Sequence, residues 1–325
     1  MELIMGFITR REGLEFTPTN IVLDFLNAKQ CKILYRLRRQ TGLQEHRDRA
    51  QDRAKGSSLH ILEYVEKSKY PIVVEYAEEP QYKSFNPLFS PDGTRVLFNQ
   101  TFGTTDIFVL PIGDEKPIKV GVGANPHWFV DQNTNKTHIV YRDTNAMFDA
   151  VPQPGKTFMV ELDKNNQPSG NPVLISNFGY GGGISTDGRY LCTAFKLSCI
   201  LDRQTGILSA PWGTVVHYPD STNQCCCPSI SPDDSGQLMV LRWPHERFSI
   251  TDFTGNTRIH FQLPEGFEEW QTPEWSTHPN FCTASAMNKE LLYNLFMINI
   301  NHKKYLQITS DSGYVHGHLW VGEQK

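Results

Sequence analysis

The stretch Asn86-Pro-Leu-Phe-Ser-Pro-Asp-Gly-Thr-Arg-Val-Leu-Phe98 decides the fold, because weaker copies of it return along the chain. The later copies occupy 125–129, 181–191, 227–234, 272–276 and 317–321. Successive copies lie about 40–55 residues apart, a period typical of β-propellers built from four-stranded blades. Within the quoted stretch, Pro91-Asp92-Gly93 favours a tight turn, because proline presets φ and glycine accepts a positive φ.

The sixth copy is incomplete, since the sequence ends at Lys325 shortly after 317–321. An open ring would leave strand edges unpaired, which favours aggregation. Three strand-like segments near the N-terminus, 31–37, 59–64 and 71–76, supply what the last blade lacks. We therefore predict an all-β fold: a six-bladed β-propeller of four-stranded blades, whose last blade is closed by N-terminal strands plus the C-terminal strand.

Two parts of the chain do not follow the repeat. Residues 1–30 form an N-terminal extension to a single propeller domain at 31–325, and 21–28 favours a short helix or a further strand. The insertion at 38–58 carries many charges of both signs and no strand pattern. It predicts a solvated loop or helix on one rim, with a partner-binding surface as the alternative.

In the third repeat unit, we predict that the outermost strand lies at 215–218.

Composition excludes several classes of protein. The net charge is −4, which argues against sequence-independent nucleic-acid binding. No apolar run approaches the ~18 residues of a membrane span, and residues 1–16 lack the pattern of a signal peptide. The seven cysteines are odd in number and contain no Cys-x-x-Cys pair. They predict reduced thiols that are mostly buried, as at Cys192 and Cys282.

The residues 86–98, followed by Asp106-Ile-Phe-Val-Leu110, resemble the WD-like repeat of TolB-type β-propellers, and 227–253 match that pattern well. Over 181–321, the order of features is also similar to a paralogous lipoprotein family of Fibrobacter-type bacteria. Those features include the glycine-rich 181–189, the cysteine-rich 225–227 and Glu274-Trp-Ser276. The resemblance implies a bacterial, protein-binding propeller in the periplasm or at the cell surface. The sequence as given, without a signal peptide, favours the cytoplasm instead.

Alternation along the first strand of each blade identifies the candidate site. The apolar residues that should pack between blades are Phe89, Trp128, Ile184, Ile230, Trp275 and Trp320. Their neighbours one and three positions earlier should face the central channel: Asn86, Leu88, Asn125, His127, Gly181, Gly183, Cys227, Ser229, Thr272, Glu274, Gly317 and Leu319. We predict that the polar members bind a ligand there: Asn86, Asn125, His127, Cys227, Ser229, Thr272 and Glu274.

The residue types in this channel leave two functions open. The first is a non-enzymatic binding or scaffold propeller that recognises a protein or glycan through one face of the disc. The second is a metal-assisted lyase or hydrolase at the channel mouth, since His, Cys and Glu are competent ligands. His316 and His318 lie two residues apart and could chelate a metal, although the predicted alternation turns them away from the channel. The sequence contains no Gly-x-Ser-x-Gly nucleophile motif and identifies no cofactor, metal or oligomeric state.

Overall fold

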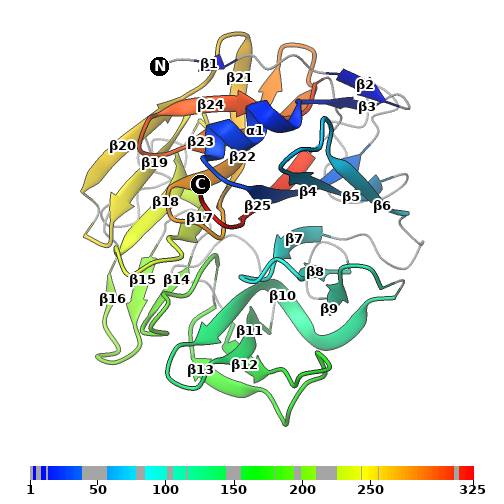
Figure 1. The fold of residues 1–325 in the computed structure, drawn as a ribbon. Helices are drawn as coiled ribbons and strands as arrows, with labels where there is room; N and C mark the ends of the chain where they lie inside the picture. The colour runs from blue at the N-terminus through cyan, green and yellow to red at the C-terminus, as the bar shows by residue number, and fades with distance from the viewer. Residues whose placement is uncertain are drawn as a thin grey trace.

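A computed structural model describes residues 3–4, 9–11, 14–38, 57–77, 85–100, 105–114, 116–143, 155–179, 181–193, 199–209, 225–242, 244–254, 256–310 and 315–325. Those residues form β-strands and one helix, α1 (Thr19–Leu26). The strands assemble into sheets arranged around a common centre, which makes the protein an all-β propeller (Figure 1).

Six blades follow one another along the chain. The strands of each blade are given from the centre outward. The first blade consists of β7 (Phe85–Phe89), β8 (Arg95–Asn99), β9 (Thr105–Pro111) and the start of β10 (Ile118–Asp131). The second blade consists of the rest of β10, β11 (Lys136–Arg142), β12 (Thr157–Glu161) and β13 (Val173–Ser176). The third contains β14 (Tyr190–Thr193), β15 (Cys199–Asp202) and β16 (Leu208–Ser209), and Ile184 bridges to Leu191 on its inner side. The fourth and fifth are β17 (Cys225–Ile230), β18 (Gln237–Arg242), β19 (Arg247–Asp252) and β20 (Thr257–Gln262), then β21 (Phe267–Trp275), β22 (Phe281–Asn288), β23 (Tyr293–Asn299) and β24 (Lys304–Gln307).

The sixth blade joins the two ends of the chain, as predicted. Its order is β25 (Val315–Val321), β4 (Gln30–Arg38), β5 (Ser57–Val65) and β6 (Ile72–Ala77), all antiparallel. In Figure 1 the red strand β25 lies beside the blue strand β4. The pairing of β25 with β4 therefore joins segments from opposite ends of the sequence, which removes the open edge expected of an incomplete ring.

The N-terminal extension contributes elements of its own. The short strand β1 (Leu3–Ile4) pairs in parallel with β24, and β2 (Thr9–Arg11) pairs with β3 (Leu14–Phe16). Helix α1 takes the place where the sequence allowed either a helix or a strand. Its buried residues Val22, Leu23 and Leu26 join a core cluster formed by the fifth and sixth blades. This helix therefore covers the seam at which the ring closes.

Two predicted segments cannot be compared with the structure. The predicted outer strand at 215–218 lies outside the described residues, and β16 is the outermost described strand of the third blade. Most of the charged insertion, 39–56, also lies outside the described residues.

Four inner strands share one backbone irregularity. The residue before the proline has a positive φ in each: 49° at Asn86, 51° at Asn125, 48° at Cys227 and 43° at Thr272. The ladder to the second strand shifts register at each of these places. Asparagine tolerates this left-handed conformation, whereas a β-branched threonine rarely adopts it. Each bulge bends the inner strand as it enters the ring centre.

The inner strand of the sixth blade differs, because β25 pairs with β4 without a bulge along its whole length. Leu319 is fully buried in the cluster with α1, whereas Trp320 is only partly buried. The anchor of this blade is therefore Leu319, one residue earlier than predicted. Trp320 packs between the sixth and first blades as predicted, but it is only partly buried. The prediction that Gly317 and Leu319 face the channel is wrong, while Trp275 is buried as predicted, at 3 % exposed.

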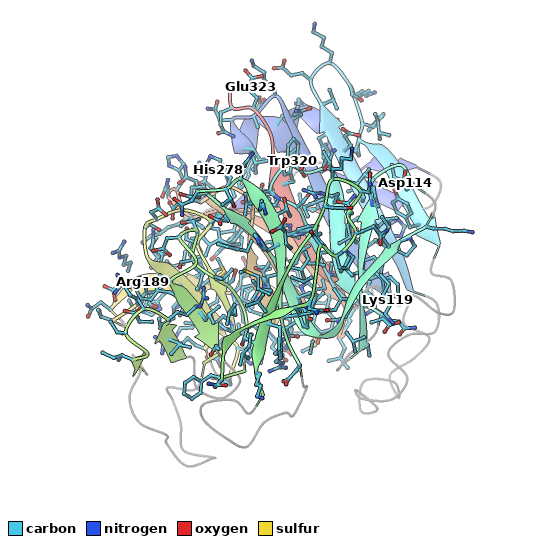
Figure 2. The ribbon with its side chains drawn as sticks, turned by 90° about the horizontal axis from the view of Figure 1, so that it is seen from below. Asp114, Lys119, Arg189, His278, Trp320 and Glu323 are labelled. Atoms are coloured by element: carbon cyan, nitrogen blue, oxygen red, sulfur yellow. The ribbon has the colours of Figure 1, made fainter. Side chains whose placement is uncertain are left out.

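Trp320 instead packs on the turn of the first blade. Its indole N–H donates to the Pro91 carbonyl at 3.1 Å, and a Cβ built on Gly93 would lie 2.4 Å from the indole ring. The ammonium of Lys32 lies 5.3 Å from the ring centroid and donates to the Gly93 carbonyl at 2.9 Å. On the fifth-blade side, the Val321 N–H donates to Thr277 Oγ1 at 3.1 Å, next to His278, which Figure 2 labels together with Trp320. The ring is thus locked by contacts on both sides of β25.

Candidate functional site

The inner strands present two tiers of residues at equivalent register positions. The anchor tier holds the residue directly before each anchor: Leu88, His127, Gly183, Ser229, Glu274 and His318. The bulge tier lies two residues earlier: Asn86, Asn125, Gly181, Cys227, Thr272 and His316. Contacts between β25 and β7, β17 and β21, and β21 and β25 bring these strands side by side around the centre.

Glu274 and Ser229 form the best-defined polar contact of the anchor tier. The Ser229 hydroxyl donates to Glu274 Oε1 at 2.6 Å and accepts the Trp275 N–H at 3.1 Å. Burial raises the pKa of the Glu274 carboxyl to about 7, against the lowering effect of the Ser229 hydrogen bond. Glu274 nevertheless keeps partial exposure. A carboxyl that is half protonated at neutral pH can donate or accept a hydrogen bond at the channel.

Three histidines lie within electrostatic reach of one another. Burial lowers the pKa of His127 to about 4. Burial together with neighbouring charges lowers the pKa of His316 to about 4 and that of His318 to about 3. At neutral pH these rings are therefore uncharged. Arg36, which pairs with His316 across the ladder, adds to the lowering at that ring.

The buried imidazole of His318 forms a hydrogen bond between two neighbouring blades. Its Nδ1 accepts the Phe89 N–H at 3.1 Å, just as Ser229 Oγ accepts the Trp275 N–H in the fourth blade. The same position thus ties each of these blades to the next one. His127 Nδ1 lies 3.3 Å from the Asn125 carbonyl of its own strand.

The bulge tier is the more accessible of the two. Asn86, Asn125, Cys227 and Thr272 are each partly exposed. The Asn125 N–H is held by Asn99 Oδ1 at 3.1 Å. The Thr272 hydroxyl is buried and has no hydrogen-bond partner among the described residues. A buried hydroxyl without a partner costs about 1–3 kcal/mol, so this position would gain from a bound polar group.

The third blade contributes backbone rather than side chains to both tiers. A Cβ built on Gly182 would lie 1.9 Å from the Pro228 carbonyl oxygen, and one on Gly183 would lie 2.8 Å from the Ile230 nitrogen. The glycine run therefore allows the third blade to approach the fourth closely, as the sequence suggested.

The structure places all seven predicted ligand-binding residues on inner strands and moves two histidines into the same tiers. His316 and His318 take the positions that we had assigned to Gly317 and Leu319. The spacing of these two histidines, two residues apart, places them on one face of the strand. The alignment of Trp320 with Trp275 assigned that face to the core instead of the channel. Within the parts of the chain that the structure describes, no group of three or more His, Cys, Asp or Glu side chains is arranged to hold a metal. Cys31, Cys192 and Cys282 are buried free thiols, and Cys227 is partly exposed.

No helix among the described residues is both long and apolar enough to cross a membrane.

Comparison with known proteins identifies the fold of this protein but not its activity. The sequence matches no protein-family model and no curated protein. The structure is similar to TolB from Acinetobacter baumannii, with a TM-score of 0.59 and 11% sequence identity. The match covers 89% of this chain and 66% of the TolB chain, so this chain spans just under two thirds of that protein. It is also similar to a putative TolB from Agrobacterium tumefaciens, with a TM-score of 0.51 and 12% identity over 90% and 98% of the two chains. A chain of the nidogen/laminin complex aligns at a TM-score of 0.52 and 8% identity over 91% and 99%. At these identities the likeness establishes a shared β-propeller fold.

Proposed function

We propose that this propeller is a non-enzymatic binding module that takes a segment of a partner protein at the bulge-tier end of its central channel. The observation that carries the proposal is the Thr272 hydroxyl, which is buried without a partner two residues from Glu274. The partly exposed amides of Asn86 and Asn125 belong to the same tier. A peptide backbone offers the alternating donors and acceptors that such a ring of amides, hydroxyl and carboxyl would engage.

The rigid ring supports recognition more than catalysis. Ser229 is committed to Glu274 and to the Trp275 N–H, and His318 is committed to the Phe89 N–H. A catalytic site needs an acid or base and a ligand set that converge on one point. The nidogen/laminin complex gives a precedent for a propeller fold in a protein–protein assembly. The resemblance of 181–321 to an exported lipoprotein family supports a partner in the periplasm or at the cell surface.

A selection with defined probes tests this proposal. A phage-displayed library of random linear peptides is selected on the immobilised protein, and a glycan array is screened in parallel. Peptides that bind the wild type should lose about tenfold in affinity on Thr272→Val, because the isosteric change removes only the hydroxyl, and on Glu274→Gln. Asn165→Ala, an exposed change in a turn of the second blade, is the matched control and should bind normally.

Peptides that bind both channel variants as tightly as the wild type would contradict the proposed site. Glycan binding that is lost in both channel variants would replace the peptide with a glycan ligand. Stoichiometric metal that survives dialysis and is lost on replacing His127 and Glu274 by alanine would instead support the metal-assisted enzyme.

A further inference from the structure

The structure also contains a cavity that none of the residues of the anchor tier or the bulge tier lines. It has a volume of about 690 Å³ and is enclosed by α1, two turns of the fifth blade and the C-terminal residues. We name it the α1 cleft. Its blade walls are the turn between β21 and β22 and the turn between β23 and β24. Neither Thr272 nor Glu274 of the fifth blade lines the α1 cleft, so the α1 cleft and the channel site are separate. A volume of this size is typical of small-molecule sites.

The lining of the α1 cleft is rich in side-chain amides. Six lining residues carry one: Asn20, Asn27, Asn280, Asn299, Asn301 and Gln324. An amide offers both a donor and an acceptor without net charge. Among the described residues, no side-chain hydrogen bond commits the amides of Asn20, Asn280 or Asn301 to another protein group. The Gln324 Nε2 is a buried donor that has no partner within the same described residues.

An aromatic surface forms part of the same cleft. Phe25 of α1 is partly buried, and its ring centroid lies 6.5 Å from that of Phe281, with the rings tilted by 45°. Such a face suits the C–H side of a flat, partly apolar ligand. Amides around an aromatic surface match a molecule with hydroxyls at its rim and C–H groups on its faces.

Charge narrows the class of ligand. The Lys325 ammonium is taken up by the Asp24 carboxylate at 2.8 Å, so this pair offers neither a free cation nor a free anion. Lys325 is not a lining residue, and the lysine that lines the cleft, Lys304, has an interaction of its own. Apart from His302, the lining holds one acidic and one basic side chain, so it carries no net charge that would favour an acidic, phosphorylated or cationic ligand.

The walls of the cleft are held in place before any ligand arrives. The Lys325 N–H donates to the Asn27 carbonyl at 2.8 Å, and Ala28 bridges to Gln324. Asn27 ends α1 in the left-handed conformation, with a φ of 52°. On the blade side, the Ile300 N–H donates to the Asn280 carbonyl at 2.8 Å. Figure 1 shows α1 and the C-terminus on the same side of the molecule. A preformed site loses less entropy when it binds.

From these observations we infer that the α1 cleft binds a neutral saccharide. Its hydroxyls engage the amides of the two blade turns and of Gln324, and one sugar face lies against Phe25. This site is independent of the channel site proposed above, so either one can fail without the other.

The test uses saturation-transfer difference NMR on the full chain with maltotetraose, cellotetraose and chitotetraose, and with tetragalacturonate as an acidic comparison. At least one neutral oligosaccharide should bind, and the acidic one should bind at least tenfold more weakly. The triple variant Asn280→Ala, Asn301→Ala, Gln324→Ala should lose at least tenfold in affinity. Asn165→Ala, in the equivalent turn of the second blade, should retain it.

A second variant, Asn301→Trp, keeps the exposed turn and fills the cleft, and it should also abolish binding. Thermal melting confirms that each variant is folded. The inference is overturned if no neutral oligosaccharide binds, if tetragalacturonate binds best, or if the triple and filling variants bind like Asn165→Ala.

Discussion

Replacing Glu274 by glutamine should make the protein more stable at alkaline pH and leave it nearly unchanged at acidic pH. The pKa of this carboxyl is raised from its ordinary value of 4.5 to about 7 because it is buried. The folded protein therefore binds the proton more tightly than the unfolded chain does. By linkage, the free energy of unfolding is highest below pH 4.5, falls as the pH rises towards 7, and then levels off.

The size of the effect follows from the difference between the two pKa values. A tenfold difference in proton affinity corresponds to about 1.4 kcal/mol, so the wild type loses at most about 3–4 kcal/mol across this range. Glu274 keeps some access to channel water, which reduces the expected loss to about 1–2 kcal/mol. Glutamine carries no charge to desolvate, and its Oε1 can still accept the hydrogen bond from Ser229.

Urea denaturation of the wild type and Glu274→Gln at pH 5 and pH 8 measures this difference. The variant should exceed the wild type by about 1–2 kcal/mol at pH 8 and match it within about 0.5 kcal/mol at pH 5. Other titrating groups cancel in the comparison. Glu290→Gln, which changes an exposed glutamate, should show the same small difference at both pH values. An equal difference between Glu274→Gln and the wild type at pH 5 and pH 8 would refute the link between burial and the raised pKa.

Two further predictions concern the closure of the ring. Leu319→Ala should lower the free energy of unfolding by about 2–5 kcal/mol, because it empties a fully buried core position. Trp320→Ala should lower it less, because the ring is partly exposed. If urea denaturation shows a larger loss for Trp320→Ala, then Trp320 and not Leu319 is the anchor of the sixth blade. Deleting 317–325 should leave β4 without its inner neighbour and give an aggregating protein by light scattering, and an unchanged melting curve would contradict the closure by β25.

The elements that depend on local chemistry and repetition were predictable from the amino-acid sequence. The turn at Pro91-Asp92-Gly93, the four-stranded units and the pairing of both chain ends in one blade could all be read from spacing. The position of Glu274 before a buried tryptophan was also readable, because side chains alternate along a strand. These features repeat, so each copy supports the reading of the others.

The residue that anchors the sixth blade could not be predicted from the sequence, because it depends on long-range strand pairing. A bulge shifts the alternation by one residue, and whether β25 has one depends on its ladder with β4, far away in sequence. Trp320 therefore looked like the anchor, while Leu319 is the residue that packs beneath α1. The same holds for the α1 cleft, whose amides come from Asn20, Asn280 and Gln324. No local pattern links residues that meet only because the first helix and the last residues of the chain dock on the same blade.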